Sequence, residues 1–187
     1  MPMAEPASRL SATASPPAGK AVLACRAVST AGERAAHFQI RHQVFVAEQG
    51  LFTSTGSGDR DAHDDDPATI HVVGLADEVI CGTVRLYPLP GVPGRWKGDR
   101  LAVLAGHRHQ GLGAPLVRFA VAAAARRDGR EMEAYIQPGN VTFFRWLGWR
   151  RAGGLVEYAG IPHQRMLIDL AASDEWRRFA APDGPGL

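Results

Sequence analysis

Several features that define common protein classes are scarce in this chain of 187 residues. It has two cysteines, Cys25 and Cys81, and both lie in apolar, strand-like runs, which predicts buried free thiols rather than a disulfide scaffold. The formal net charge of +2 is too small to favour a nucleic-acid partner. No apolar run approaches the roughly 18 residues that a membrane-spanning helix needs, and no secretory signal is recognisable. These absences predict a cytoplasmic protein with neither nucleic acid nor membrane as partner.

The composition predicts a single folded domain between two tails. Hydrophobic residues make up 45% and charged residues 21%, which is ordinary for a globular domain. Residues 1–19 are rich in Ala, Ser and Pro and predict a disordered N-terminal tail. Residues 173–187 predict a flexible C-terminal tail, so the folded domain is expected at residues 20–172.

Hydrophobic periodicity predicts an alternation of strands and helices. Thr30 and Glu33 form a T-x-x-E capping box, which opens a helix that Gly50 ends. Further helices are expected at 111–127 and 140–147, and strands at 20–28, 69–76, 79–87, 99–105, 131–137, 149–158 and 164–170. This order predicts an α+β layer fold around a central sheet, not a doubly wound one.

The most informative segment is LAVLAGHRHQGLGA, from Leu101 to Ala114. It reads as an apolar strand, a turn and a glycine-rich helix start, with Arg108, Gly111 and Gly113 in the spacing R-x-x-G-x-G. Glycines allow a tight turn and close approach of a ligand, and the first N–H groups of a helix attract an anion. The segment therefore predicts a pyrophosphate site.

Other phosphate motifs fit this segment less well. A Walker loop needs G-x-x-x-x-G-K-S/T, which is absent, and a dinucleotide fingerprint needs a third glycine where Leu116 stands. The alternative without a ligand is an ordinary glycine-containing helix start.

The segment resembles the coenzyme A loop of the GNAT acetyltransferases, whose signature is Q/R-x-x-G-x-G/A. The resemblance extends over about residues 21–170 and includes the segments IRHQVFVAEQG, CGTVRLYP and NVTFFRWLGW and the ending EYAGIPHQRM. Within that superfamily, the chain is similar to a group of predicted acetyltransferases associated with nitrilase clusters and nitrogen starvation. The resemblance implies a mixed central sheet with helices on both faces, and acetyl-CoA as co-substrate.

The resemblance also implies which residues bind coenzyme A. The strand Leu101, Ala102 and Val103 would contact the pantetheine arm, and a backbone N–H near Val103 would stabilise the oxyanion. The pyrophosphate would bind at Arg108, His109, Gln110, Gly111, Leu112, Gly113 and Ala114. Asn140 and Phe144 would lie along the far side of the arm. The reaction implied is direct attack of a small-molecule amine on the thioester.

One residue departs from the family pattern. The usual general acid is the tyrosine of an F-Y pair, but this chain has Phe143 and Phe144. Phe144 cannot protonate the leaving thiolate. Coenzyme A thiolate could leave without an acid, Tyr135 or Tyr158 could substitute, or turnover could be weak or absent.

Two residues are candidates for the base that deprotonates the amine. Glu48 lies at the end of the first predicted helix, where substrate-side residues of this fold gather; its alternative is a solvated charge. His163 lies in a hairpin that borders the substrate cleft in this fold, and its pKa range suits proton transfer. We expect Trp146 and Trp149 to lie in the core.

The acidic run DRDAHDDDP, from Asp59 to Pro67, allows several interpretations. It could attract a cationic amine or bind a metal, but a calcium loop would need glycine at its sixth position and an acidic residue where Ile70 stands. We expect a solvated acidic loop and no metal.

Two rival functions stay open. Arg41, Phe45 and the RLYP run from Arg85 are also similar to acyl-homoserine-lactone synthases, which would need an acyl-carrier protein and S-adenosylmethionine. The other rival is a non-catalytic acyl-CoA sensor or binding module, which the missing tyrosine favours. The acceptor, the acyl chain length and the oligomeric state, including a homodimer, are open.

Overall fold

The computed structural model describes residues 20–53 and 56–170, so both predicted tails lie outside the described residues. The predicted order of helices and strands is confirmed. The strands are β1 (Leu23–Ala27), β2 (Ile70–Ala76), β3 (Val79–Pro88), β4 (Arg95–Val103), β5 (Glu131–Ile136), β6 (Arg150–Tyr158) and β7 (Ile161–Asp169). The helices are α1 (Ala31–Arg41), α2 (Gly113–Ala125) and α3 (Val141–Trp146), with short helical turns η1 (His42–Glu48), η2 (Ala62–Asp64), η3 (Ala105–Gln110) and η4 (Pro138–Asn140).

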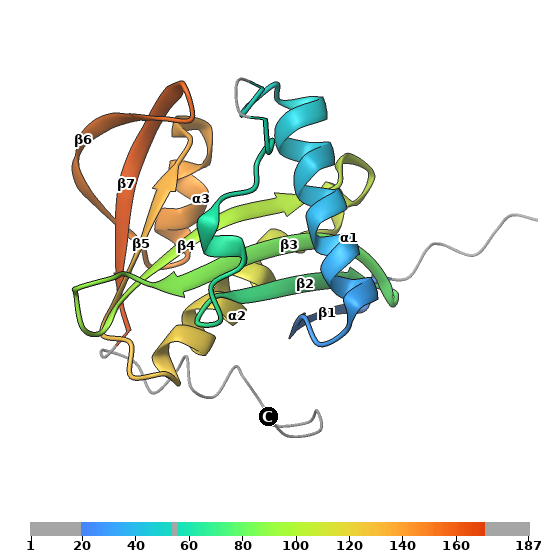
Figure 1. Ribbon diagram of the computed structural model, residues 1–187, viewed down its shortest axis with the longest axis horizontal. Helices are drawn as coiled ribbons and strands as arrows, with labels where there is room; N and C mark the ends of the chain where they lie inside the picture. Colours follow the sequence, from blue (N-terminus) through green and yellow to red (C-terminus); the bar gives the residue numbers. More distant parts are fainter. Residues whose placement is uncertain (1–19, 54–55, 171–187) are drawn as a thin grey trace, which may run out of the picture.

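The strands form one mixed sheet with the order β1-β2-β3-β4-β5-β7-β6. All neighbouring strands are antiparallel except β4 and β5, which run parallel. Figure 1 shows α1 on one face of the sheet and α2 on the other, as expected. The capping box at the start of α1 is formed: the Thr30 side chain accepts from the Glu33 N–H, and Glu33 bonds back to the Thr30 N–H.

Helix α2 packs very closely on the sheet at two glycines. A Cβ atom at Gly82 would lie 2.9 Å from side-chain atoms of both Leu112 and Leu116, and one at Gly74 would lie 3.0 Å from Leu116. Both leucines are fully buried. Because Leu112 immediately precedes α2, this contact holds the start of the helix, and the turn before it, against the sheet.

The pairing between the parallel strands β4 and β5 ends after three residue pairs. Arg95, Trp96 and Lys97 pair with Glu131, Met132 and Glu133, and no pairing follows. The rest of β4 and β5 diverge, which leaves a gap in the middle of the sheet.

Two details differ from expectation. Trp146 is 82% exposed, so the prediction that it lies in the core was wrong, whereas Trp149 is buried. The first helix does not continue in α-form to Gly50, because π-type hydrogen bonds begin after Arg41; the Gln49 N–H bonds to the Val44 carbonyl at 3.1 Å.

Within residues 20–53 and 56–170, every helix is too short or too polar to cross a lipid bilayer.

Candidate active site

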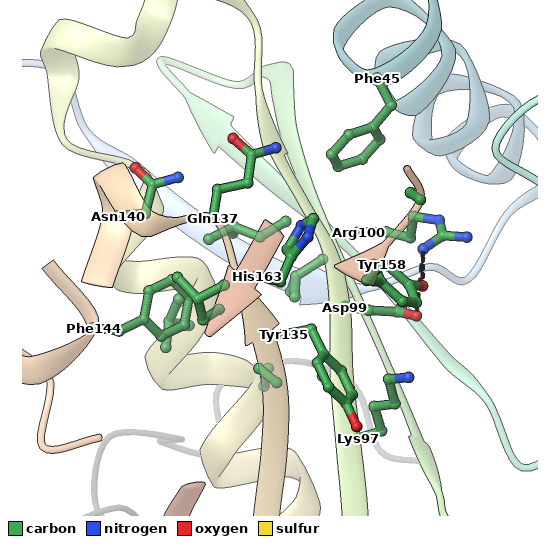
Figure 2. A pocket seen from close by; sticks show the side chains of 18 of the residues that line it. Phe45, Lys97, Asp99, Arg100, Tyr135, Gln137, Asn140, Phe144, Tyr158 and His163 are labelled. Carbon is green, nitrogen blue, oxygen red and sulfur yellow. Dashed lines mark hydrogen bonds and ion pairs between the residues drawn. The ribbon is translucent and has the colours of Figure 1, made fainter. Parts of the chain in front are cut away.

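The gap between β4 and β5 contains a cavity of about 140 Å³. One part of its wall is apolar and comes from β3, α2, β5 and α3, including Val84, Val117, Ala120, Met132 and Phe144. The other part is polar and aromatic (Figure 2), and its lining side chains include Lys97, Asp99, Arg100, Tyr135, Tyr158 and His163. The cavity can therefore accommodate a ligand with one apolar and one polar end.

The π-helical turn η1 supplies one rim of this cavity. Phe45 and Gln49 both line it, and the Gln137 side-chain amide on the opposite side donates a hydrogen bond to Gln49 Oε1 at 3.0 Å. π-Helical turns are rare and occur frequently at functional sites. The turn thus links the end of α1 to the mouth of the gap.

A β-bulge in β4 shapes the polar wall. The register with β3 shifts between Thr83 and Arg85, and Arg100 has a φ of 52°, which is a costly conformation for a residue with a side chain. The Arg100 guanidinium holds it there by donating to the Asp59 carbonyl, to Asp61 and to the Tyr158 hydroxyl at 2.9–3.0 Å. The bulge interrupts the ladder between β3 and β4 at residues that line the cavity, Asp99, Arg100 and Leu101.

The acidic run from Asp59 to Pro67 is solvated only in part: Asp65 and Asp66 are exposed, as expected, but two other aspartates of the run are buried. Asp59 and Asp64 are 2% and 1% exposed, because they pair with fully buried arginines. Arg41 donates to both, and Arg85 donates to Asp64 at 2.7 Å and to Asp99 at 2.7–2.8 Å. The loop is thereby fixed behind the polar wall of the cavity. We call this group the buried ion cluster; its members are Arg41, Arg85, Arg100, Asp59, Asp61, Asp64 and Asp99.

The electrostatics of the buried ion cluster favour charged carboxylates. Burial alone raises the pKa of Asp64, but hydrogen bonds from Arg41 and the charges of Arg41 and Arg85 outweigh it and lower that pKa. For Asp61, burial is likewise outweighed by Arg85 and Arg100, and the pKa is lowered. Arg41 and Arg85, on which the expected similarity to acyl-homoserine-lactone synthases partly rests, are held by aspartates and do not line the cavity.

A second cavity of about 410 Å³ lies beside the turn before α2. Nine of the twelve residues predicted to bind coenzyme A line it: Leu101, Ala102, Val103, Arg108, Gly111, Gly113, Ala114, Asn140 and Phe144. The other three, His109, Gln110 and Leu112, do not; the Leu112 side chain is buried against the sheet. Gln49, Leu101, Asn140 and Phe144 line both cavities, so the two meet there.

The turn itself is suited to a phosphate group. Gly111 has a φ of 80°, and a Cβ atom there would meet no protein atom within 4 Å, so the space above it is open. The N–H groups of the first turn of α2 lack partners within the helix. The residues present therefore fit the pyrophosphate that the resemblance implies.

Glu48 and Arg108 form an ion pair at the rim of the second cavity. The Arg108 guanidinium lies 2.7 Å from the Glu48 carboxylate and donates to the Val103 carbonyl at 3.0 Å. Glu48 lines neither cavity. In this arrangement Glu48 orients Arg108 beside the turn that precedes α2.

His163, by contrast, lines the cavity in the sheet. It lies in β7 rather than in the hairpin turn before it. Its Nδ1 is 2.9 Å from the Ile161 carbonyl, so Nδ1 carries the proton and the lone pair of the neutral ring is on Nε2. Figure 2 shows His163 with Asn140 and Phe144 on one side and Lys97, Tyr135 and Tyr158 on the other.

Phe144 packs edge-to-face on Trp149 with ring centroids 5.4 Å apart, at the junction of the cavities. Tyr135 and Tyr158 both line the cavity in the sheet and stack on each other. Lys97 and Arg100 also line it, and sequence reasoning did not identify them. Their signal was two basic residues in the RWKGDR run that proved to be a central strand.

The family of the chain follows from comparison with known proteins. The sequence profile of the Acetyltransferase (GNAT) family matches residues 37–149. The chain belongs to this family. GNAT enzymes are acyltransferases that use acyl-CoA, and the mixed sheet with its helices is the GNAT fold.

The chain matches several solved structures of the same fold over nearly the whole length of those structures. ElaA from Escherichia coli has a TM-score of 0.67 and 18% identity over 79% of this chain and 98% of that chain. An acyl-CoA N-acyltransferase from Pseudomonas aeruginosa has a TM-score of 0.65 and 24% identity, with the same coverage. BjaI, a CoA-dependent acyl-homoserine lactone synthase solved with SAM and isopentyl-CoA, has a TM-score of 0.68 and 18% identity over 89% and 95%. An acyl-CoA N-acyltransferase and an acyl-homoserine lactone synthase thus share the fold of this chain.

Proposed function

We propose that this GNAT protein transfers an acyl group, in the first place acetyl from acetyl-CoA, directly to the amine of a small molecule. The supporting observation is that two cavities meet at Gln49, Leu101, Asn140 and Phe144. One cavity lies beside the phosphate-binding turn, and the other has a polar wall. An amine in the second cavity would reach a thioester at the junction, and holding both reactants there supplies much of the rate enhancement.

The chain's backbone would bind the donor. The N–H groups from His109 to Ala114 would hold the pyrophosphate, and the segment Leu101–Val103 would contact the pantetheine arm. Asn140 and Phe144 would flank that arm. A backbone N–H near Val103 would stabilise the oxyanion that develops when the amine attacks.

His163 is the stronger candidate for the base. An amine must be neutral to attack, so a base removes its proton directly or through water. His163 lines the cavity, and because its Nδ1 contacts the Ile161 carbonyl, Nε2 is the ring nitrogen left to accept a proton. Glu48 is engaged with Arg108 outside both cavities, so its part in the reaction would be to position the turn.

The leaving thiolate would depart without help from Phe144. Tyr135 and Tyr158 are the alternative acids, because both hydroxyl-bearing rings line the cavity. The Tyr158 hydroxyl accepts from Arg100 at 2.9 Å, which leaves its own proton available to donate.

A longer acyl-CoA is the second candidate donor. The apolar wall formed by Val117, Ala120 and Met132 lies in the core, next to the junction, and offers an acyl chain a surface on which to pack. Each buried CH₂ group would contribute about 0.8 kcal/mol to binding.

A screen of amines with acetyl-, butyryl- and hexanoyl-CoA, read as free thiol, tests the proposal. We expect amine-dependent thiol release, and the donor series reports the acyl length. Coenzyme A binding without thiol release from any pair would favour the sensor. The similarity to the nitrilase-associated group, the homodimer and the cytoplasmic location stay predictions.

A further inference from the structure

Lys97 has an unusual environment in the cavity between β4 and β5. Its Nζ lies 4.7 Å from the ring centroid of Tyr135 and 5.2 Å from that of Tyr158. The two rings are stacked, with centroids 5.6 Å apart and an interplanar angle of 12°. Figure 2 shows Lys97 beside Tyr135 on the polar side of the cavity. Among the described residues, Lys97 forms no ion pair, so no carboxylate oxygen lies within 4.0 Å of its Nζ.

The neighbouring charges are already compensated. Asp99 accepts two hydrogen bonds from Arg85. Glu133, the residue opposite Lys97 in the register of β4 and β5, accepts a hydrogen bond from Arg165 at 2.6 Å. The other basic group in the lining, Arg100, bonds to Asp61 and to the Tyr158 hydroxyl. A partly buried ammonium is costly unless it is paired. The cation–π contacts compensate only part of that cost.

We infer that the acceptor amine also carries a carboxylate, and that Lys97 binds it. The substrate class is therefore an amino acid or another amine with an acidic group. The inference rests on the proposed function, because it places the acceptor in the same cavity. An ammonium–carboxylate contact is a charge-assisted hydrogen bond, which is stronger than a neutral one. The Tyr135 and Tyr158 rings would form the walls on which the acceptor's carbon chain packs.

The orientation of the acceptor follows from the strand. Lys97 is four residues before Leu101, where the two cavities meet; a regular strand would separate them by roughly 13 Å, and the bulge at Arg100 shortens this distance. The amine would point toward the junction and His163, and the carboxylate toward Lys97. The separation of amine and carboxylate is thus a variable that the experiment should scan.

The test compares glycine, β-alanine, 4-aminobutyrate and 6-aminohexanoate, each with its own carboxamide, as acceptors with acetyl-CoA. Each pair is measured on the unmodified protein and on Lys97→Met, Lys97→Arg and Arg118→Met. The last removes an exposed charge from α2. Differences in amine pKa between acid and amide cancel, because every variant sees the same pairs.

We expect Lys97→Met to raise the KM of the preferred acid by about 10- to 100-fold, the range for a hydrogen bond between charged groups, with a much smaller change for its amide. Lys97→Arg should retain the preference for the acid, and Arg118→Met should not alter it. Equal losses for acid and amide would overturn the inference, because Lys97 would then only support the tyrosine wall. Turnover of amides but of no acid would overturn it too, while the proposed function stands.

A binding measurement covers the case in which no acceptor releases thiol, which would count against the proposed function. Calorimetry then compares 6-aminohexanoate binding to the coenzyme A-saturated protein and to its Lys97→Met variant. Weaker binding to the variant supports the carboxylate site. Equal binding, or none to either, overturns it.

Discussion

Arg85→Met tests whether the buried ion cluster holds the polar wall of the active site. The Arg85 guanidinium is fully buried and donates to Asp61, Asp64 and Asp99 at 2.7–2.8 Å. Three guanidinium groups face four carboxylates in this cluster, so the substitution leaves two facing four. Methionine fills part of the volume and keeps the apolar stem, so the change reports mainly on charge.

At neutral pH, we expect Arg85→Met to lower the free energy of unfolding by a large amount. Removing one partner of a buried ion pair typically costs about 3–5 kcal/mol of unfolding free energy, because the remaining charges are left uncompensated. In the unmodified protein the pKa values of Asp61 and Asp64 are lowered from 3.8, so their contribution is present above that pH and is lost as the pH falls through the folded values. In the variant, burial and repulsion should raise these pKa values, so acid would neutralise the excess charge. The difference between the two proteins should therefore shrink on acidification.

Urea unfolding of both proteins at about pH 7 and about pH 4.5 measures the difference in unfolding free energy at each pH. The control is Arg95→Met, which breaks the more exposed pair of Arg95 with Glu131 and should cost about 0–1 kcal/mol. A loss below about 1 kcal/mol for Arg85→Met, or an equal loss at both pH values, would refute the charge argument.

Four substitutions address the reaction itself. His163→Gln should lower the rate at neutral pH by roughly 10²–10⁴, the usual effect of losing a general base, whereas Glu48→Gln should leave the pH profile of the rate unchanged; the reverse result would make Glu48 the base. Phe144→Tyr should leave the rate the same or raise it, because it adds the missing proton donor at the junction; a marked fall in thiol release with unchanged coenzyme A affinity would contradict this. Gly111→Val should weaken coenzyme A binding in calorimetry, since φ is 80° there and the side chain would fill the open space above the turn. Unchanged affinity would mean that the phosphates bind elsewhere.

The order of the elements was predictable because it depends on local patterns. The alternation in the strands, the Thr30–Glu33 capping box and the glycines around Leu112 each act over a few residues. The turn before α2 could be identified for the same reason. Most of the residues predicted around it do line one cavity.

The polar half of the site was not predictable in this way. In the sequence, Asp59 and Asp64 have the pattern of a solvated acidic run. The fold buries them because α1 and β3 place Arg41 and Arg85, which are distant in the sequence, against them. Lys97 lies outside the strand expected at residues 99–105, because the prolines before it obscured the start of β4 at Arg95. Burial of such groups depends on long-range pairing, for which a single sequence gives no signal.

The central claim is direct transfer between reactants held at the junction of the two cavities. A single-turnover experiment tests it, with protein in excess over acetyl-CoA labelled in the acetyl group and with the best amine from the screen. The account predicts that the label appears on the amine together with an equimolar amount of free thiol, and that no labelled protein accumulates. Label retained on the protein, or thiol released without an acylated amine, would contradict it.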